Sequence, residues 1–226
     1  DEVPSRGLGD VYKRQAMSFD EALRFETQEF AKLATSDAAR NIIRTSFVNK
    51  GKADKLFRRP QGFDKVSYSK IAVLGAGLMG AGIAHIAAKA GIDVVLLDSK
   101  IEFAEKGKNY SEKIVNKAIE RGRMTREKAD ALLAKIHPTV DYNDLSDCQL
   151  VIEAVFEDVD IKADVTRKAE AVLPESAIYA SNTSTIPITT LSKASKRPDQ
   201  FIGLHFFSPV ERMPLIEVIS LSLIHI

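Results

Sequence analysis

The sequence predicts a doubly wound α/β fold, in which a mostly parallel β-sheet is covered by helices on both faces. From residue 70 onward, short apolar and β-branched runs alternate with helical patterns. The first run leads directly into a glycine-rich turn, and a helical pattern follows that turn. Strands that alternate with helices imply a parallel sheet, and right-handed crossovers make the doubly wound arrangement the natural one.

A short helical segment is expected before the sheet. Ser18 and Glu21 form a capping-box pattern, in which Ser18 accepts from a backbone N–H and Glu21 reaches back. The apolar residues that follow share one helical face: Ala22, Leu23, Phe30 and Leu33. A second helix is expected from Ser36 or Asp37, with an apolar side of Ile42, Ile43 and Phe47. Residues 49–65, rich in Lys and Arg and interrupted by Gly and Pro, predict a linker.

The sheet itself is expected to contain six strands, at residues 71–74, 94–97, 150–155, 177–180, 201–204 and 215–219. The helical patterns between them cover residues 78–90, 102–121, 126–136, 158–172 and 187–194. Residues 1–15 (DEVPSRGLGDVYKRQ) and 221–226 (LSLIHI) resemble translated adapter sequence, so we expect a non-native leader and tail; genuine flexible tails are the alternative. The remaining chain divides into a helical segment with a basic linker (16–66) and a sheet-bearing domain (67–220).

Composition excludes several classes of protein. The 226 residues carry 32 Lys and Arg against 31 Asp and Glu, so the net charge of +1 gives no reason to expect nucleic acid as a partner. No apolar run approaches the roughly 20 residues of a membrane-spanning helix. The single cysteine, Cys148, cannot form an intramolecular disulfide, which fits a reducing cytoplasm. The His, Cys and acidic residues show no metal-ligand spacing, so no metal is expected.

The glycine-rich turn, GAGLMG from Gly75 to Gly80, has the GxGxxG spacing of a dinucleotide-binding loop. Gly75 permits the tight turn, Gly77 lets the pyrophosphate approach the backbone, and Gly80 lets the helix pack close to the strand. The N–H groups at the start of that helix then face the phosphates. Asp98 ends the second strand, where a carboxylate accepts from ribose hydroxyls and repels a 2′-phosphate, so the cofactor is predicted to be NAD. Lys100 lies nearby and would soften that preference. The domain is therefore expected to be of the Rossmann type.

With the glycine loop and Asp98, four further segments carry a resemblance to a known family. They are VIEAVFE (151–157), SNTS (181–184), GLHFFSP (203–209) and LIEV (215–218). With them the chain resembles the 3-hydroxyacyl-CoA dehydrogenase family, and in particular the bacterial multifunctional fatty-acid oxidation α-subunit type. The resemblance covers about 150 residues. The helical segment before the sheet looks like the tail of the hydratase-like domain that precedes the dehydrogenase in such fusions.

The resemblance implies roles for individual residues. Met79 lies in the cofactor loop, Val155, Phe156 and Glu157 lie at the nicotinamide side, and Lys162 matches a cofactor contact. Ser184 would bind near the nicotinamide and the substrate oxygen. His205 matches the catalytic histidine, and Glu217 matches the acid paired with it. Ser208 stands where the family usually has Asn, and its hydroxyl lacks the reach of the amide. A further catalytic Asn of the family lies beyond the region present here.

The implied reaction is NAD-dependent oxidation of an L-3-hydroxyacyl-CoA to the 3-ketoacyl-CoA in fatty-acid β-oxidation. His205 would take the hydroxyl proton as general base, because the pKa of free imidazole lies near operating pH. Glu217 would orient the ring, and Ser184 would donate to the developing ketone oxygen. The resemblance also implies an acyl-CoA substrate and, in the full-length protein, a homo-oligomer or a complex with a thiolase subunit.

Alternatives stay open at this point. The chain could act on 3-hydroxybutyryl-CoA or another 3-hydroxy acid, or it could be an NAD-binding module that is inactive in isolation. A lone His between apolar residues is usually a core residue, Glu217 could be a plain strand-end acid, and Ser184 could cap a turn. One carboxylate of the pair Glu153 and Glu157 could be merely solvated. The other histidines are interpreted as structural or incidental: His85, His137 and His225.

Overall fold

The computed structural model describes residues 15–57 and 59–221. The chain divides into two compact units, Asp1–Lys65 and Val66–Ile226, and each is described by itself. The leader predicted at residues 1–15 and the tail predicted at residues 221–226 lie outside the described residues, except for Gln15 and Leu221. His225 also lies outside them. None of the described helices is long and apolar enough to cross a membrane.

The first unit is helical. Helix α2 covers Phe19–Thr35 and α3 covers Asp37–Ile43, as the sequence predicts. At the start of α2 the backbone N–H and the hydroxyl of Ser18 both donate to Glu21 Oε2, at 3.0 and 2.6 Å. At the start of α3 the hydroxyl of Ser36 accepts from the N–H of Ala39. Only Ala22 is buried among the α2 residues, so the predicted apolar face of α2 is largely exposed within this unit.

The predicted linker is partly helical, which corrects the interpretation of residues 49–65. A π-helical segment, η1 (Arg44–Asn49), leads into α4 (Lys50–Asp54). A single glycine in a helix costs only about 1 kcal/mol, and Lys and Ala are good helix formers. The Lys50 ammonium also pairs with Asp54 at 2.7 Å across one helical turn. Regular structure ends near Leu56, whose positive φ of 51° is incompatible with a continuing helix.

The second unit contains a seven-stranded sheet of order β3-β2-β1-β4-β5-β6-β7. All neighbouring pairs are parallel except β6 and β7. The strands are β1 (Lys70–Leu74), β2 (Asp93–Leu97), β3 (Ile136–Thr139), β4 (Leu150–Glu153), β5 (Ile178–Ser181), β6 (Phe201–Phe206) and β7 (Ile216–Ile219). The chain reverses its direction of winding between β1 and β4. Doubly wound sheets bind ligands at the carboxyl ends of the strands beside such a point.

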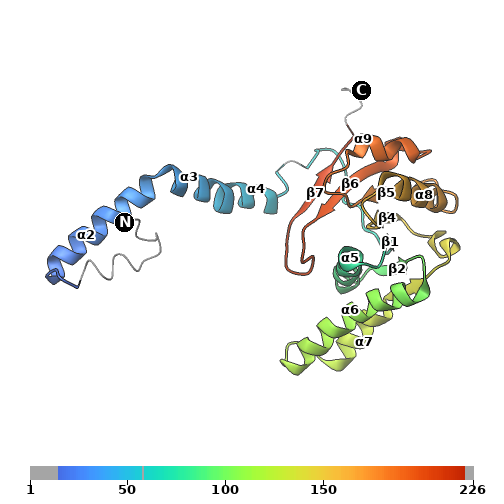
Figure 1. The fold of residues 1–226 in the computed structure, drawn as a ribbon, viewed down its shortest axis with the longest axis horizontal. Coiled ribbons are helices and arrows are strands. Elements are labelled where there is room, and N and C mark those ends of the chain that lie inside the picture. The colour runs from blue at the N-terminus through green and yellow to red at the C-terminus, as the bar shows by residue number, and fades with distance from the viewer. Residues whose placement is uncertain (1–14, 58, 222–226) are drawn as a thin grey trace. The chain divides into compact units, whose positions relative to one another are not determined.

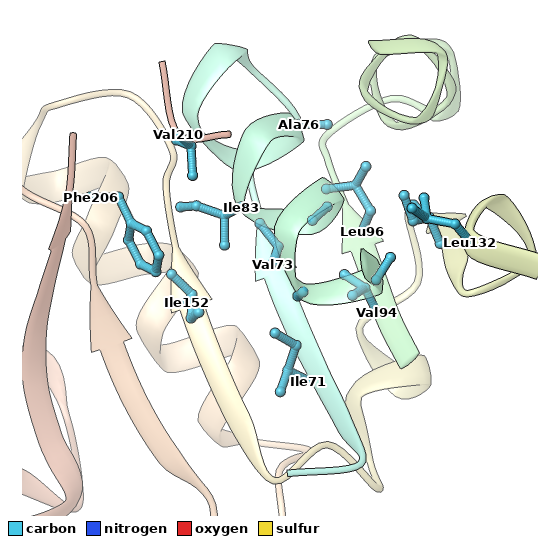
Figure 2. Close-up of a cluster of buried hydrophobic side chains, with 14 of the residues drawn as sticks. Ile71, Val73, Ala76, Ile83, Val94, Leu96, Leu132, Ile152, Phe206 and Val210 are labelled. Carbon is cyan, nitrogen blue, oxygen red and sulfur yellow. The ribbon is translucent and has the colours of Figure 1, made fainter. Parts of the chain in front are cut away.

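Helices cover both faces of this sheet (Figure 1). One face packs against α5 (Leu78–Lys89), α6 (Ile101–Glu120) and α7 (Arg126–Ala134), and the other packs against α8 (Val159–Glu170) and α9 (Ile188–Leu191). Successive residues of β1 enter opposite cores, because side chains alternate along a strand. Ile71 and Val73 join the core under α5, which Figure 2 shows, and Ala72 and Leu74 join the core under α8. Short 3₁₀ turns complete the unit, η2 (Tyr142–Leu145), η3 (Ser192–Ala194) and η4 (Pro198–Gln200).

The structure corrects the predicted elements in three places. The helix predicted for residues 126–136 ends at Ala134, and Ile136–Thr139 forms the missed strand β3. Pro138 obscures this strand in the sequence, but a proline is tolerated here because β3 lies at the sheet edge. Strand β4 ends at Glu153, so Val155 belongs to the following loop. Strand β6 runs on to Phe206 and therefore contains His205.

Candidate active site

The glycine loop joins β1 to α5 in the geometry that the spacing predicts. Gly75 has a φ of +93°, and a Cβ added there would lie 2.7 Å from the carbonyl oxygen of Ala154. A Cβ on Gly80 would lie 1.7 Å from the carbonyl oxygen of Gly75, so only glycine lets α5 approach the loop. A Cβ on Gly77 would meet nothing within 4 Å. The fold therefore requires the first and third glycines, whereas the second leaves open space at the start of α5.

Asp98 follows β2 and fixes the glycine loop from the side. Its Oδ2 accepts from the N–H of Ala76 at 2.7 Å, and its Oδ1 accepts from the N–H of Ser99 at 2.6 Å. The side chain is half-buried. The carboxylate thus has a fixed position beside the glycine loop.

Two cavities lie along the carboxyl edge of the sheet. The larger, of about 790 Å³, is lined by the glycine loop, Asp98, Val155 and Phe156 among others. The smaller, of about 390 Å³, is lined by Glu157, Ser184, His205 and Ser208 among others. Both are lined by Met79, Ala154 and Val155, so the two cavities adjoin. This pair of adjoining cavities suits an elongated ligand with two halves, and the glycine loop lies at the larger one.

His205 lies between an acid and a hydroxyl. Strands β6 and β7 place His205 directly opposite Glu217, and His205 Nδ1 lies 2.7 Å from Glu217 Oε2. Because a carboxylate only accepts, Nδ1 carries the proton of the neutral ring, and Nε2 is left as an acceptor. The hydroxyl of Ser184 lies 3.1 Å from that Nε2 and donates to it. The ring of Phe207 packs against the imidazole with centroids 4.7 Å apart.

This arrangement faces solvent and the smaller cavity. The side chain of His205 is 19% exposed, and that of Glu217 is 54% exposed. His205 is therefore not a packed core residue, and Nε2 is directed toward the edge of the sheet where Ser184 lies. The other histidines have different surroundings. His85 is buried in α5, and His137 lies in the edge strand β3.

Glu157 lies where the loop after β4 meets the turn after β5. Its Oε1 accepts from the hydroxyl of Thr183 at 2.5 Å and from the N–H of Ser184 at 3.2 Å. Partial burial alone would raise the pKa of Glu157, but the hydrogen bond from Thr183 and the charge of Lys162 hold it below the ordinary value. The carboxylate is therefore ionised at neutral pH.

Lys162 and Glu153 occupy positions that the sequence does not reveal. Both side chains are 1% exposed, and the Lys162 ammonium lies 2.7 Å from Glu153 Oε1 and 3.2 Å from Glu157 Oε2. Lys162 lines neither of the two cavities. Both Glu153 and Glu157 contact the Lys162 ammonium, so the expectation that one of these two carboxylates is merely solvated is wrong. An acid directly after three apolar strand residues is the only sequence signal for Glu153.

The remaining residues singled out by the sequence lie around the cavities. Phe156 is 76% exposed at the wall of the larger cavity. Ser208 lines the smaller one, at the start of a turn with a cis peptide bond to Pro209. Asn182, which sequence reasoning missed, ties this turn region to β5, because its side-chain oxygen accepts from the N–H of Phe206. Within the described residues, no group of three or more His, Cys, Asp or Glu side chains is arranged to hold a metal ion.

The chain is similar to known proteins over nearly its whole length. Residues 70–222 match the family described as 3-hydroxyacyl-CoA dehydrogenase, NAD binding domain. A fatty acid oxidation complex subunit alpha of Pseudomonas entomophila is 39% identical over 219 residues, and one of Psychrobacter arcticus is 38% identical over 217. Each match covers 96% of this chain, and the chain spans 30% of the length of these curated relatives.

Solved structures show the same likeness. FadB2 of M. tuberculosis superposes with a TM-score of 0.66 at 38% identity, covering 70% of this chain and 57% of that one. The (S)-3-hydroxybutyryl-CoA dehydrogenase PaaH1 of Ralstonia eutropha gives a TM-score of 0.65 at 36% identity, covering 67% and 54%. The predicted Rossmann-type fold is therefore confirmed.

Proposed function

The chain belongs to the family of 3-hydroxyacyl-CoA dehydrogenase NAD-binding domains, and we propose that it supplies the cofactor site and the acid–base pair of an enzyme that oxidises L-3-hydroxyacyl-CoA. The observation that carries this proposal is the alignment of Ser184, His205 and Glu217 beside the smaller cavity. The substrate would be an acyl-CoA. The alternative substrate is 3-hydroxybutyryl-CoA, because the similar structures include 3-hydroxybutyryl-CoA dehydrogenases.

NAD fits the residues that are present. The open space at Gly77 admits a pyrophosphate to the backbone at the start of α5, where N–H groups and the helix dipole favour an anion. The fixed carboxylate of Asp98 would accept from the ribose hydroxyls and repel a 2′-phosphate. Gly75, Gly77, Met79, Gly80 and Asp98 would hold the larger half of the cofactor. Val155, Phe156, Glu157, Ser184 and Ser208 would surround the nicotinamide half, which supplies the hydride acceptor when bound.

His205 would be the general base. With Nδ1 donating to Glu217, the Nε2 lone pair is available for a hydroxyl proton, and Ser184 shows that a hydroxyl can reach it at 3.1 Å. Glu217 would hold the ring in this tautomer and stabilise the imidazolium that forms, as the acid does in a hydrolase triad. Ser184, displaced from Nε2 by the substrate hydroxyl, would be close enough to donate to the ketone oxygen as it develops.

The wider assignments are proposals about the full-length protein. Residues 16–66 would be the tail of a hydratase-like domain, since the matched relatives align with 96% of this chain whereas the family match begins at residue 70. Residues 67–220 would form the NAD-binding dehydrogenase domain. The relatives are named as subunits of a complex, which supports association with another subunit. That partner would be a thiolase subunit or a second copy of the protein, as the resemblance implies. A cytoplasmic location is supported by the single, buried cysteine.

Substitution of Gly77 by alanine tests the cofactor site. Since the new Cβ would contact nothing in the structure, the variant should keep its melting temperature. The methyl group would occupy the approach of the pyrophosphate, and calorimetry with NADH should show an affinity lower by about tenfold or more. Gly51→Ala in α4 is the matched control, because its Cβ also has open space, and it should bind NADH normally. Equal NADH affinity in Gly77→Ala and the parent chain would contradict the proposed site.

Turnover by the chain alone tests how much of the enzyme it contains. In a 340 nm assay with acetoacetyl-CoA and NADH, we expect binding of NADH but little or no turnover, since the chain spans under a third of its relatives' length. Strong turnover would show that the chain is catalytically sufficient. Absence of NADH binding would favour a packing module over an enzyme domain.

A further inference from the structure

Glu153 is a buried carboxylate whose partners are all specified. It ends β4, is 1% exposed, and accepts at Oε1 from the Lys162 ammonium at 2.7 Å and from the N–H of Val155 at 2.8 Å. Its Oε2 accepts from the hydroxyl of Ser181 on β5 at 2.7 Å. A buried charge is tolerated when it is paired and hydrogen-bonded, so this carboxylate is fully accommodated as an anion. Burial raises the pKa of Tyr179 on β5, and the negative charge of Glu153 adds to that effect.

Lys162 connects this buried carboxylate to the site. It lies on α8 with its ammonium between Glu153 and Glu157, which come from the end of β4 and from the loop after it. Lys162 is as buried as Glu153, so its positive charge is balanced by these two carboxylates and not by solvent. Two carboxylates and one ammonium leave this trio with a net charge of −1. Loss of the charge at Glu153 would remove one of the two attractions on the Lys162 ammonium, which would then move closer to Glu157.

Glu157 transmits the connection to the turn after β5. The oxygen that faces away from Lys162 accepts from the hydroxyls of Thr183 and Thr185 and from the N–H of Ser184. The hydroxyl of Ser184 in turn donates to His205 Nε2. A continuous series of charged and polar contacts thus runs from the sheet interior to the imidazole.

We propose that Glu153 is a positioning residue, which holds Ser184 at His205 through Lys162 and Glu157. This inference rests on the proposed function for its catalytic meaning. Glu153 lines neither cavity, so its influence on the site runs through its partners. Of these, Lys162 is the one whose ammonium also contacts Glu157, whereas the N–H of Val155 connects Glu153 only to the cavity wall. Charge-assisted hydrogen bonds are short and geometrically specific, which suits this role.

The test is Glu153→Gln in the full chain, followed by ¹⁵N NMR without nucleotide. Glutamine keeps the size of the side chain; its oxygen can still accept from Lys162 and Val155, and its amide can donate to Ser181. Only the charge is lost, so Lys162 should move toward Glu157 and displace that carboxylate. We expect the amide signal of Ser184 and the ring signals of His205 to shift, although neither residue touches Glu153. NADH affinity should fall about tenfold, as for one weakened charge-assisted hydrogen bond.

Glu170→Gln is the matched control. Glu170 lies on the same helix as Lys162 and accepts in the same way from the hydroxyl of Ser195 and the N–H of Lys196. Its loss of charge should shift the Lys196 amide signal and leave Ser184, His205 and NADH affinity unchanged. Shifts confined to Val155 and Ser181 in Glu153→Gln, with Ser184 and His205 at their parental positions, would overturn the proposal.

A double variant covers the case in which Glu153→Gln does not fold. Glu153→Gln with Lys162→Met removes the buried cation together with its counter-ion, a change that buried ion pairs often tolerate. In this double variant Glu157 lacks its lysine, so the NMR signals of Ser184 and His205 should still shift. Signals of Ser184 and His205 at their parental positions would refute the proposal. Loss of the fold in both variants would also refute it. If the parent chain fails to bind NADH while these signals shift, the proposed function fails and the positioning role stands.

Discussion

The two halves of the candidate site differ in how the fold supports them. The cofactor cradle, comprising Gly75, Gly77, Gly80 and Asp98, lies between the central strands β1 and β2 and the helix α5, with β1 almost wholly buried. The catalytic edge, comprising His205 and Glu217, lies on β6 and β7, and every residue of β7 is exposed in the described structure. The proposed cradle is thus enclosed by buried elements of this unit, whereas the proposed catalytic edge lies on a strand that is exposed within the described residues. Nucleotide binding and turnover should therefore be separable.

Removal of the imidazole should have the largest effect and should leave the cradle intact. In the full-length protein, His205→Ala should lower kcat for L-3-hydroxyacyl-CoA by about 10²–10⁴, the usual contribution of a general base. NADH affinity should stay normal, because the cradle does not depend on His205. Steady-state kinetics and calorimetry on the same preparation separate the two quantities. A variant with parental kcat would refute the assignment of His205 as base.

A pair of valine truncations compares the stability of the two regions. Val73 in β1 is fully buried beneath α5, as Figure 2 shows, while Val218 in β7 is 70% exposed. Val73→Ala should lower the free energy of unfolding by about 2 kcal/mol, since it leaves a cavity in a packed core. Val218→Ala should change it by less than about 0.5 kcal/mol. Urea unfolding measures both, and similar costs would mean that β7 is packed as tightly as the sheet interior.

The pH dependence of stability should show a small effect of Glu157, which lies between the cradle and the catalytic edge. The pKa of Glu157 is lower in the folded chain than its ordinary value of 4.5, so folding favours the ionised form. Its contribution is present above about pH 4.5 and is lost as the pH falls through the lowered value. Because this side chain is 39% exposed, solvent screening limits the contribution to under about 1 kcal/mol.

Glu157→Gln should therefore reduce the free energy of unfolding at pH 6, and its difference from the parent should shrink as the pH falls through the lowered pKa of Glu157. Urea titrations at a series of pH values, with Glu170→Gln as the control, give the two curves. If the difference in free energy of unfolding between Glu157→Gln and the parent instead grew as the pH fell, folding would favour the protonated form of Glu157, and the prediction would be wrong.

The accuracy of the sequence predictions follows the range of the interactions involved. The glycine loop and its neighbours β1 and α5 were predictable because the residues that decide them are adjacent along the chain. Strand β3 was missed because Pro138 and the preceding helix dominate the local pattern, while its pairing with β2 is a tertiary contact. The helical start of the linker was missed because the helix propensity of Lys50, Lys52 and Ala53 compensates for the unfavourable propensity of Gly51.

Local patterns of residues were enough to identify the glycine turn, the carboxylate after β2, and the family to which GLHFFSP and its companion segments belong. The distances between side chains, and the burial of Lys162 between two carboxylates, follow only from the packing of the elements. Register in an antiparallel pair places Glu217 opposite His205, and packing of α8 on the sheet buries Lys162 between two carboxylates. These contacts join residues from different elements, and the energy of the buried pair Lys162–Glu153 also depends on exclusion of water, which no local pattern of residues encodes.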